Sequence, residues 1–208
     1  MSGAPDFFCR EAQRLGYVAR SAFKLLQMQK RYKLMSPGSS VLDLGCAPGA
    51  WLQVLCQHIG QVTDGGVVVG IDTKKVKVPP MHCDSRVKTV CADVMKLSTE
   101  EVRLLSPQQK EGFSVVLSDM CPLISGIPTR DAALSVDLGM RALDLAVGRD
   151  KSCDGVLRRG GNLVIKFLES EDAKGFHKIC KSLFEKSSWL RPKATRSCSK
   201  EIYLICQG

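Results

Sequence analysis

Short runs of apolar and β-branched residues alternate along the chain with segments in which apolar residues recur every three or four positions. Runs of the first kind are typical of buried strands, and segments of the second kind are typical of amphipathic helices. We therefore predict strands over 41–44, 67–72, 87–93, 113–119, 162–167, 189–194 and 201–206. Helices are predicted over 18–35, 50–58, 99–105, 131–147 and 171–186, with loops over 121–130 and 148–155.

The strand runs are continuously apolar instead of alternating with polar residues, and helical segments separate most of them. Strands of this kind belong to parallel sheets that helices cover on both faces. No linker, repeat or low-complexity tract divides the sequence. We therefore predict a single doubly wound α/β domain over residues 1–208, in which residues 1–17 form a basic N-terminal arm.

A glycine-containing loop follows the first predicted strand, in the stretch VLDLGCAPGAW over residues 41–51. A dinucleotide loop would carry a glycine where Ala47 stands, and Pro48 removes a backbone donor that a phosphate could use. The Gly-Lys-Ser/Thr ending of a P-loop is also missing. The loop favours a nucleoside with an amino-acid tail, such as S-adenosylmethionine, although a glycine turn of this kind is also often purely structural.

Three successive predicted strands end in an acid, at Asp72, Asp93 and Asp119. Ligands of open α/β sheets bind beyond the carboxyl ends of the strands, where these side chains would meet. Asp72 follows Gly45 at about the interval at which a strand-end acid reaches ribose hydroxyls in nucleotide-binding folds. Three such acids favour a shared site over three separate helix caps or solvated turns.

Lys166 lies inside the apolar run LVIKF, where a lysine rarely sits without a partner. One interpretation is a lysine whose amine extends to solvent at the strand end. The other is a partly buried amine beside Asp119 at the ligand-binding edge, a setting in which the pKa of a lysine becomes useful for chemistry. We favour the second.

The net charge of the chain indicates which class of binding partner to expect. The chain has 30 lysine and arginine residues against 21 acidic residues, a formal net charge of +9. For a domain of this size, such an excess favours an anionic partner such as nucleic acid over a generically basic surface. No apolar run approaches the roughly 20 residues that cross a bilayer, so we expect no membrane span.

Ten cysteines are scattered along the sequence without any C-x-x-C pair. Cysteines in apolar runs, such as Cys91 and Cys206, are typical of small core residues in a reducing compartment. We therefore expect an intracellular protein, with cytoplasm, mitochondrion and nucleus all left open. Because paired ligand spacing is absent, we expect no metal site.

Five motifs, in this order, resemble the FtsJ-like (RrmJ-type) 2′-O-ribose RNA methyltransferase family. They are RSAFKL over 20–25, DLG through PGAW over 43–51, SDM over 118–120, LVIKF over 163–167, and Arg196 with EIY over 201–203. The resemblance covers nearly the whole chain. It implies the Rossmann-like fold of S-adenosylmethionine-dependent methyltransferases, with a mostly parallel seven-stranded sheet and one reversed strand.

The resemblance also implies roles for individual residues. The implied catalytic tetrad consists of Lys24, Asp119, Lys166 and Glu201. The implied contacts of S-adenosylmethionine, which leaves as S-adenosylhomocysteine, are Gly49, Trp51, Asp72, Asp93 and Asp119, with Gly45 and Pro48 shaping the loop. After Asp119-Met120 the family commonly reads Ala-Pro-Asn, whereas this chain reads Cys121-Pro122-Leu123. The missing asparagine amide puts in doubt any contact that it makes and could alter the choice of target.

A mechanism follows from these roles. A ribose 2′-hydroxyl is a weak acid, so a base must accept its proton as the methyl group is transferred. We expect Lys166 to be this base, its neutral form favoured by burial and by nearby Lys24. Asp119 would orient the amine while its negative charge opposes that shift, and the sequence leaves open which effect wins. Lys24 and Glu201 would position the ribose.

Three basic runs, over 30–33, 74–77 and 191–196, would hold phosphates, although each alone is more often a solvated face. We expect a monomer that acts on ribosomal RNA in a ribosomal particle, by analogy with the family. The alternatives are transfer RNA, a protein or small-molecule substrate, and a non-catalytic RNA-binding module of the same fold.

Overall fold

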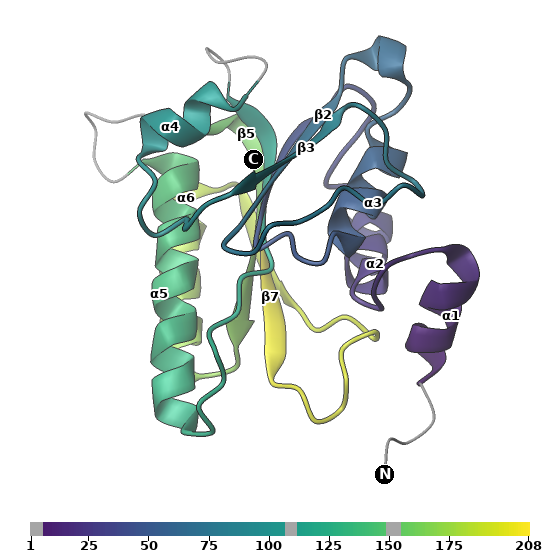
Figure 1. Cartoon of the computed structure of the whole chain (residues 1–208). Coiled ribbons are helices and arrows are strands. Elements are labelled where there is room, and N and C mark those ends of the chain that lie inside the picture. The colour runs from purple at the N-terminus through teal and green to yellow at the C-terminus, as the bar shows by residue number, and fades with distance from the viewer. Residues whose placement is uncertain (1–5, 107–111, 149–154) are drawn as a thin grey trace.

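A computed structural model of the chain describes residues 6–106, 112–148 and 155–208. Over these residues seven strands form one sheet in the order β3-β2-β1-β4-β5-β7-β6 (Figure 1). The strands are β1 (Ser40–Leu44), β2 (Val67–Asp72), β3 (Val87–Cys91), β4 (Phe113–Ser118), β5 (Leu157–Leu168), β6 (Lys186–Leu190) and β7 (Glu201–Gln207). The helices are α1 (Phe7–Leu15), α2 (Ala22–Tyr32), α3 (Ala50–His58), η1 (Val62–Asp64), α4 (Thr99–Leu104), α5 (Pro128–Val147) and α6 (Glu171–Leu183).

Strand direction confirms the predicted fold class. Strands β3, β2, β1, β4 and β5 pair in parallel, whereas β7 runs antiparallel to both β5 and β6. The sheet is therefore mostly parallel with one reversed strand, and the chain is an α/β protein with Rossmann-like layers.

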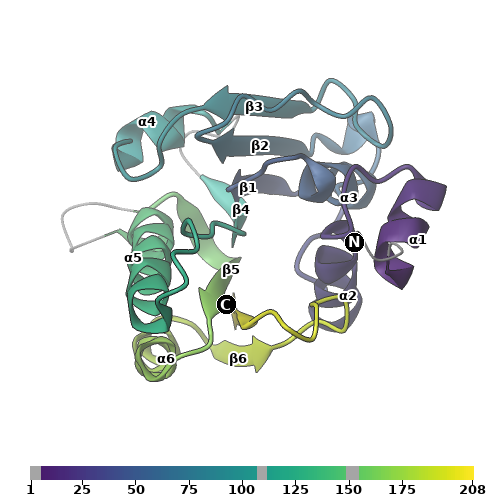
Figure 2. The same ribbon diagram turned by 60° about the horizontal axis from the view of Figure 1, so that its bottom comes forward.

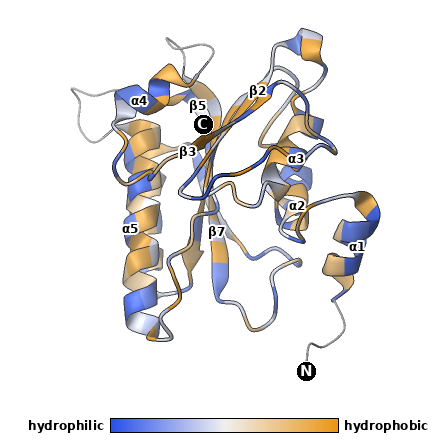
Figure 3. Ribbon diagram, viewed as in Figure 1, coloured by the Kyte–Doolittle hydropathy of each residue, from blue (hydrophilic) through white to orange (hydrophobic). Residues whose placement is uncertain are grey.

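Helices cover both faces of the sheet (Figure 2). Buried residues of α2 and α3 form one core with one face, among them Leu25 and Leu55. Buried residues of α4, α5 and α6 form a second core with the other face, among them Leu145 and Phe176. The hydropathy colouring shows α5 banded along its length, as expected for a helix with one apolar face and one solvent face (Figure 3).

Most predicted elements are present, but several boundaries were wrong. Helix α2 begins at Ala22 instead of Val18, because the Val18 N–H donates to the Gln53 side chain at 2.8 Å in the turn before the helix. Helix α5 begins at Pro128, inside the expected loop, since proline suits the first turn of a helix. Strand β5 begins at Leu157, and β6 spans 186–190 in place of 189–194 because it follows the register of β7.

Two further expectations changed. The expected N-terminal arm contains helix α1, whose N-cap Asp6 accepts a hydrogen bond from the Cys9 N–H at 3.0 Å. Cys91 is exposed and not a core residue, because β3 is an edge strand, whereas Cys206 is fully buried in β7. Of the expected loop over 148–155, residues 149–154 lie outside the described residues.

The order of the strands determines where a ligand can bind. Strand β1 lies between β2 and β4, so the direction in which the chain winds reverses beside it. Leu44 at the end of β1 is in register with Ser118 at the end of β4, and the Asp119 N–H donates to the Leu44 carbonyl at 3.0 Å. The glycine loop and Asp119 therefore meet at the carboxyl edge of the sheet.

Candidate active site

Gly45 begins the loop after β1 in a conformation that favours glycine, with φ of 81°. A Cβ atom at this position would lie 2.9 Å from the backbone nitrogen of Met120, in the segment after β4. The loop continues through a cis peptide bond between Ala47 and Pro48. Glycine is therefore required here for the close approach of the two segments.

The N–H groups of this loop already have partners. Those of Gly45 and Cys46 donate to the Ile71 carbonyl, and that of Gly49 donates to the Cys46 carbonyl at 2.7 Å. The Ala47 N–H donates to Asp72 Oδ2 at 3.0 Å, and Pro48 has none. A diphosphate would need such groups free, so the hydrogen bonds give a second reason to exclude a dinucleotide cradle.

A cavity of about 570 Å³ opens beside the loop, within the range of about 300–1,000 Å³ for small-molecule sites. It brings together five of the residues predicted from the sequence, namely Gly45, Asp72, Asp93, Asp119 and Lys166. Pro48, Gly49 and Trp51 lie outside its lining. The Trp51 indole is buried, donates to the Ser21 carbonyl at 3.0 Å and packs 6.0 Å from the Tyr203 ring.

Backbone groups fix the acids at the ends of β2 and β3. Asp72 accepts hydrogen bonds from the N–H groups of Ala47 and Lys74, at 3.0 and 2.8 Å. Asp93 accepts one from the Met95 N–H at 3.0 Å, and its other oxygen lies 3.6 Å from the exposed Lys96 amine. Carboxylates have several acceptor positions, so both side chains can accept further hydrogen bonds from a nucleoside in the cavity.

Asp43 lies in β1 directly before this loop. Its side chain is fully buried, and neither carboxyl oxygen has a hydrogen-bond partner. Burial raises its pKa well above the usual range, and the charges of Asp119 and Asp72 add to that rise. Asp43 does not line the cavity, but Asp72, Asp93 and Asp119 do, and these three acids suit a cationic ligand. The carboxylate acceptors fit the hydroxyl groups of the nucleoside and the positively charged sulfonium and ammonium groups of S-adenosylmethionine.

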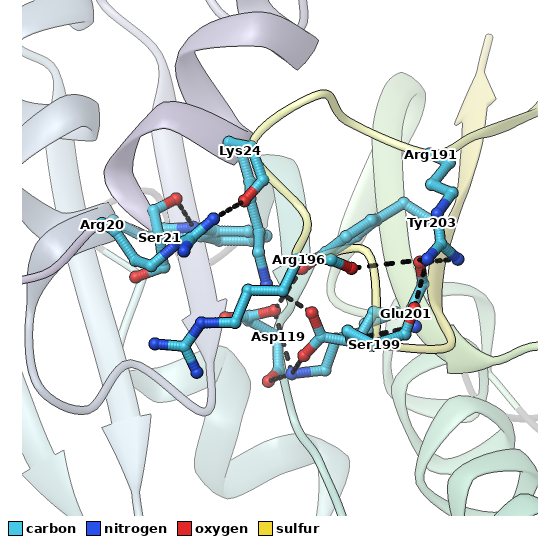
Figure 4. Close-up of polar contacts among 12 residues, drawn as sticks. Arg20, Ser21, Lys24, Asp119, Arg191, Arg196, Ser199, Glu201 and Tyr203 are labelled. Carbon is cyan, nitrogen blue, oxygen red and sulfur yellow. Dashed lines mark hydrogen bonds and ion pairs between the residues drawn. The ribbon is translucent and has the colours of Figure 1, made fainter. Parts of the chain in front are cut away.

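The four residues of the predicted tetrad converge where β4 and β5 end and the antiparallel strand β7 begins. Figure 4 shows three of them, Lys24, Asp119 and Glu201. The Lys166 amine lies 3.0 Å from Asp119 Oδ1 and 3.7 Å from Glu201 Oε1, and it donates to the Asp119 carbonyl at 2.5 Å. Lys24, from the first turn of α2, lies 2.5 Å from Glu201 Oε2. Two lysines and two acids therefore alternate in one contiguous network.

Burial and the charges of nearby acids act on the protonation state of Lys166 in opposite directions. Its side chain is only 6% exposed, and this burial lowers the pKa of the amine. The charges of Asp119, Cys121 and Glu201 outweigh burial, so the pKa of Lys166 is raised above its ordinary value. Lys24 cannot reverse this, because Glu201 already neutralises its charge. In the protein without ligands the charges of the neighbouring acids therefore outweigh burial, and the amine is held in its protonated form.

Glu201 stays charged in the same network. Burial raises the pKa of its carboxyl, but the hydrogen bond and charge of Lys24, followed by the charge of Lys166, bring it below the ordinary value. The carboxylate therefore joins the two amines, with one oxygen toward each. This arrangement fixes the distance between the two lysines.

Sequence reasoning did not assign a role to Tyr203. Its hydroxyl donates to Asp119 Oδ1 at 2.8 Å, and its ring is completely buried. Burial, followed by the charges of Asp119 and Glu201, raises the pKa of this phenol well above its usual range, so the hydroxyl remains a donor. Alternation along β7 could have found it, because Glu201 and Tyr203 point to the same face.

A second cavity, of about 660 Å³, lies on the other side of the network. It is lined by the start of α5, the segment between β5 and α6, and the segment before β7 with Glu201. Cys121, which departs from the family pattern, lines both large cavities. Lys166 and Asp119 line one cavity and Glu201 lines the other, so the tetrad stands between them.

The basic runs are exposed but not equivalent. Lys30, Arg31 and Lys33 are exposed at the end of α2, and the lysines of residues 74–77 are exposed after β2. In the third run, Arg191 donates to the carbonyls of Ser199 and Glu201, so this side chain supports the loop before β7.

Among the described residues, no helix is long and apolar enough to span a membrane.

Comparisons with known proteins identify the family of this chain. Residues 17–208 match the family described as FtsJ-like methyltransferase. A relative from Desulfatibacillum aliphaticivorans, named ribosomal RNA large subunit methyltransferase E, is 38% identical over 96% of this chain and 88% of its own length. A relative of the same name from Methanocaldococcus jannaschii is 35% identical over 97% of this chain and 78% of its own.

A solved structure shares the fold. It is described as a ribosomal RNA methyltransferase from Plasmodium falciparum and aligns with a TM-score of 0.70. The alignment covers 92% of this chain and 97% of the other, at 22% sequence identity.

Proposed function

Because this chain belongs to the FtsJ-like methyltransferase family, we propose that it transfers a methyl group from S-adenosylmethionine to a ribose 2′-hydroxyl of ribosomal RNA. Family membership supports methyl transfer, and the names of the relatives support ribosomal RNA. The observation that carries the ribose assignment is the Lys166 amine, which lines the cavity beside the glycine loop and lies 3.0 Å from Asp119 and 3.7 Å from Glu201. An RNA substrate also implies a place inside the cell.

The cavity beside the glycine loop would hold the methyl donor. When bound, S-adenosylmethionine supplies a methyl group activated by a positively charged sulfur. Asp72 and Asp93, fixed by backbone N–H groups, would accept hydrogen bonds from the nucleoside. Gly45 lets the ligand approach the backbone closely, and the surrounding carboxyl groups favour a cation.

The tetrad would act on the acceptor. Lys166 would accept the proton of the ribose 2′-hydroxyl as its oxygen takes the methyl group that the bound donor would supply. Since Lys166 is protonated in the free protein, it must first lose a proton to solvent. Asp119 and Glu201 hold the amine in place, and Lys24 fixes Glu201. Alignment of donor and acceptor supplies much of the catalysis.

The experiment is methyl transfer from labelled S-adenosylmethionine to three substrates: large-subunit ribosomal particles, free ribosomal RNA and transfer RNA. A 2′-O-methyl group blocks alkaline cleavage of the adjacent phosphodiester, so labelled dinucleotides must survive alkali. We expect such dinucleotides from ribosomal RNA. Label in alkali-sensitive mononucleotides would refute the ribose assignment, label in transfer RNA alone would refute the substrate, and no label at all would favour a non-catalytic RNA-binding module.

A further inference from the structure

Two arginines from distant segments contact one carboxylate at the mouth of the tetrad. Arg20, before α2, forms an ion pair with Asp6, and the Nε atom of Arg196, before β7, lies 3.8 Å from the same oxygen of Asp6. The close-up shows the Arg196 side chain extending toward the segment that carries Arg20 and Lys24 (Figure 4). Asp6 therefore lies at a point where two positive charges converge.

The two arginines line a small cavity that reaches the tetrad. Its volume is about 260 Å³, and its lining includes Arg20, Lys24, Arg196, Ser199 and Glu201. Lys24 and Glu201 neutralise each other at 2.5 Å, so the excess charge of this cavity comes from the arginines. An anion bound here would lie beside the ribose that the tetrad holds.

Arg20 is held as a preformed donor. Its side chain is only 14% exposed, donates to the Ala194 carbonyl at 2.6 Å and lies 5.6 Å from the Phe8 ring centroid. Both guanidinium groups contact the same Asp6 oxygen, so they lie close together. Burial and then the charge of Arg196 lower the pKa of Arg20. An anion between the two guanidinium groups reduces their mutual repulsion.

We propose that Arg20 and Arg196 form a binding site for an RNA phosphate, and that Asp6 occupies this site as an internal anion until RNA displaces it. The proposal rests on the proposed function in so far as the substrate is RNA. Guanidinium groups match phosphate oxygens with paired hydrogen bonds, which favours the phosphate over a carboxylate that one of them contacts at 3.8 Å.

Asp6 is suited to leave. Its side chain is 41% exposed, and Arg196 is 63% exposed, so solvent already screens this pair. The other Asp6 oxygen accepts a hydrogen bond from the Cys9 N–H at the start of α1. The carboxylate therefore also caps this helix, a role that does not involve the arginines. The chain can therefore release Asp6 from the site without unfolding α1.

The decisive variant is Asp6→Asn, because asparagine caps a helix as well as aspartate but carries no charge. The measurement is the affinity for a short fluorescent single-stranded RNA, by anisotropy, over a series of salt concentrations and without methyl donor. We expect roughly threefold to tenfold tighter binding at low salt, with the gain fading as salt rises. Weaker or unchanged binding would overturn the proposal.

Glu11→Gln is the matched control. It removes one negative charge from the same helix, but from an exposed pair with Arg14 that lies outside the cavity. We expect it to change RNA affinity much less than Asp6→Asn. An equal gain in the two variants would mean that net charge alone acts, and the competition by Asp6 would be refuted.

A double-mutant cycle locates the site. Arg196→Gln should weaken RNA binding, and the gain from Asp6→Asn should largely disappear in that background. If Asp6→Asn still tightened RNA binding by the full amount in the Arg196→Gln background, the gain would not depend on Arg196, and the proposal would be overturned. Circular dichroism and thermal melting verify that each variant folds.

The assay separates this proposal from the proposed function. Tighter RNA binding by Asp6→Asn without methyl transfer by any variant would support the anion site and refute the activity. Ribose methylation by the protein, with no change of RNA affinity in Asp6→Asn, would support the activity and refute the anion site. RNA that fails to bind at all would refute the anion site directly.

Discussion

The two halves of the sheet's carboxyl edge hold their charged side chains in different ways. On the half formed by β1, β2 and β3, Asp72 and Asp93 accept hydrogen bonds from backbone N–H groups. On the half formed by β4, β5 and β7, the side chains of Lys166, Asp119 and Glu201 contact one another. The first half is fixed by the main chain, and the second by mutual neutralisation.

This difference predicts how each half responds to substitution. A residue fixed by the backbone can be replaced while its neighbours keep their places, so its loss should affect one ligand. In the charged network, each residue is a partner of the next, so the loss of one changes the positions and pKa values of the others. We call the half with β1, β2 and β3 the donor half and the half with β4, β5 and β7 the tetrad half. A substitution in the donor half should weaken one ligand contact, whereas a substitution in the tetrad half should disturb the whole network.

The largest effect is expected for Lys166→Met, which keeps much of the side-chain volume and removes the amine. We expect the rate of methyl transfer at saturating substrates to fall by roughly 10²–10⁴, the usual contribution of a positioned acid or base. Binding of S-adenosylmethionine, measured by calorimetry, should persist.

Lys174→Met is the matched control for Lys166→Met, because Lys174 is 59% exposed and pairs only with Glu171 among the described residues. It should be fully active. A Lys166→Met protein that retains more than about a tenth of the activity would rule out the amine as the base.

The second effect is a dependence on pH. Since the pKa of Lys166 is raised, its neutral form is scarce at neutral pH and grows tenfold with each pH unit below that pKa. With donor and RNA both limiting, the rate should rise roughly a hundredfold between about pH 6 and pH 8. A rate that is already constant above pH 7 would show that Lys166 rests in its neutral form.

The third effect tests the donor half with Asp72→Ala. This change removes the acceptor of the Ala47 and Lys74 N–H groups, together with the proposed acceptor for the nucleoside. We expect S-adenosylmethionine to bind about 10–100-fold more weakly, with RNA affinity unchanged. The rate at saturating donor should fall far less than in Lys166→Met, and an equally large fall would erase the distinction between the halves.

The smallest effect is expected for Tyr203→Phe. The ring and its packing against Trp51 remain, while Asp119 loses one hydrogen bond. We expect the maximal rate to fall by roughly threefold to tenfold, with little change in affinity for donor or RNA. Tyr17→Phe is the control, because it removes an exposed hydroxyl bonded to Gln57, and no loss beyond that control would mean that Asp119 needs no support from Tyr203.

Strand ends and glycine loops could be predicted from the sequence, because they depend on local patterns. Apolar runs ending in Asp72, Asp93 and Asp119 predicted a shared edge, and the structure places all three on one cavity. The order of β5, β7 and β6 in the sheet was harder to predict from the sequence, since it depends on pairing between segments that are far apart along the chain. The bounds of β6 were missed for that reason.

Interactions between side chains of different elements could not be predicted in this way. The roles of Tyr203 and Trp51 depend on which face of the core each ring occupies. The pKa direction of Lys166 depends on distances of a few ångströms to two acids, which no pattern of residues gives. The contact of Asp6 with Arg20 and Arg196 joins three segments and becomes visible only in three dimensions.

The ion pair between Lys24 and Glu201 has a consequence for how the chain folds. The two residues are separated by 177 positions, so the tetrad closes only when nearly the whole chain has found its place. Contacts of such long separation form slowly, after local helices. During refolding, recovery of methyl transfer should therefore lag behind recovery of helical signal, so activity serves as a late reporter of folding.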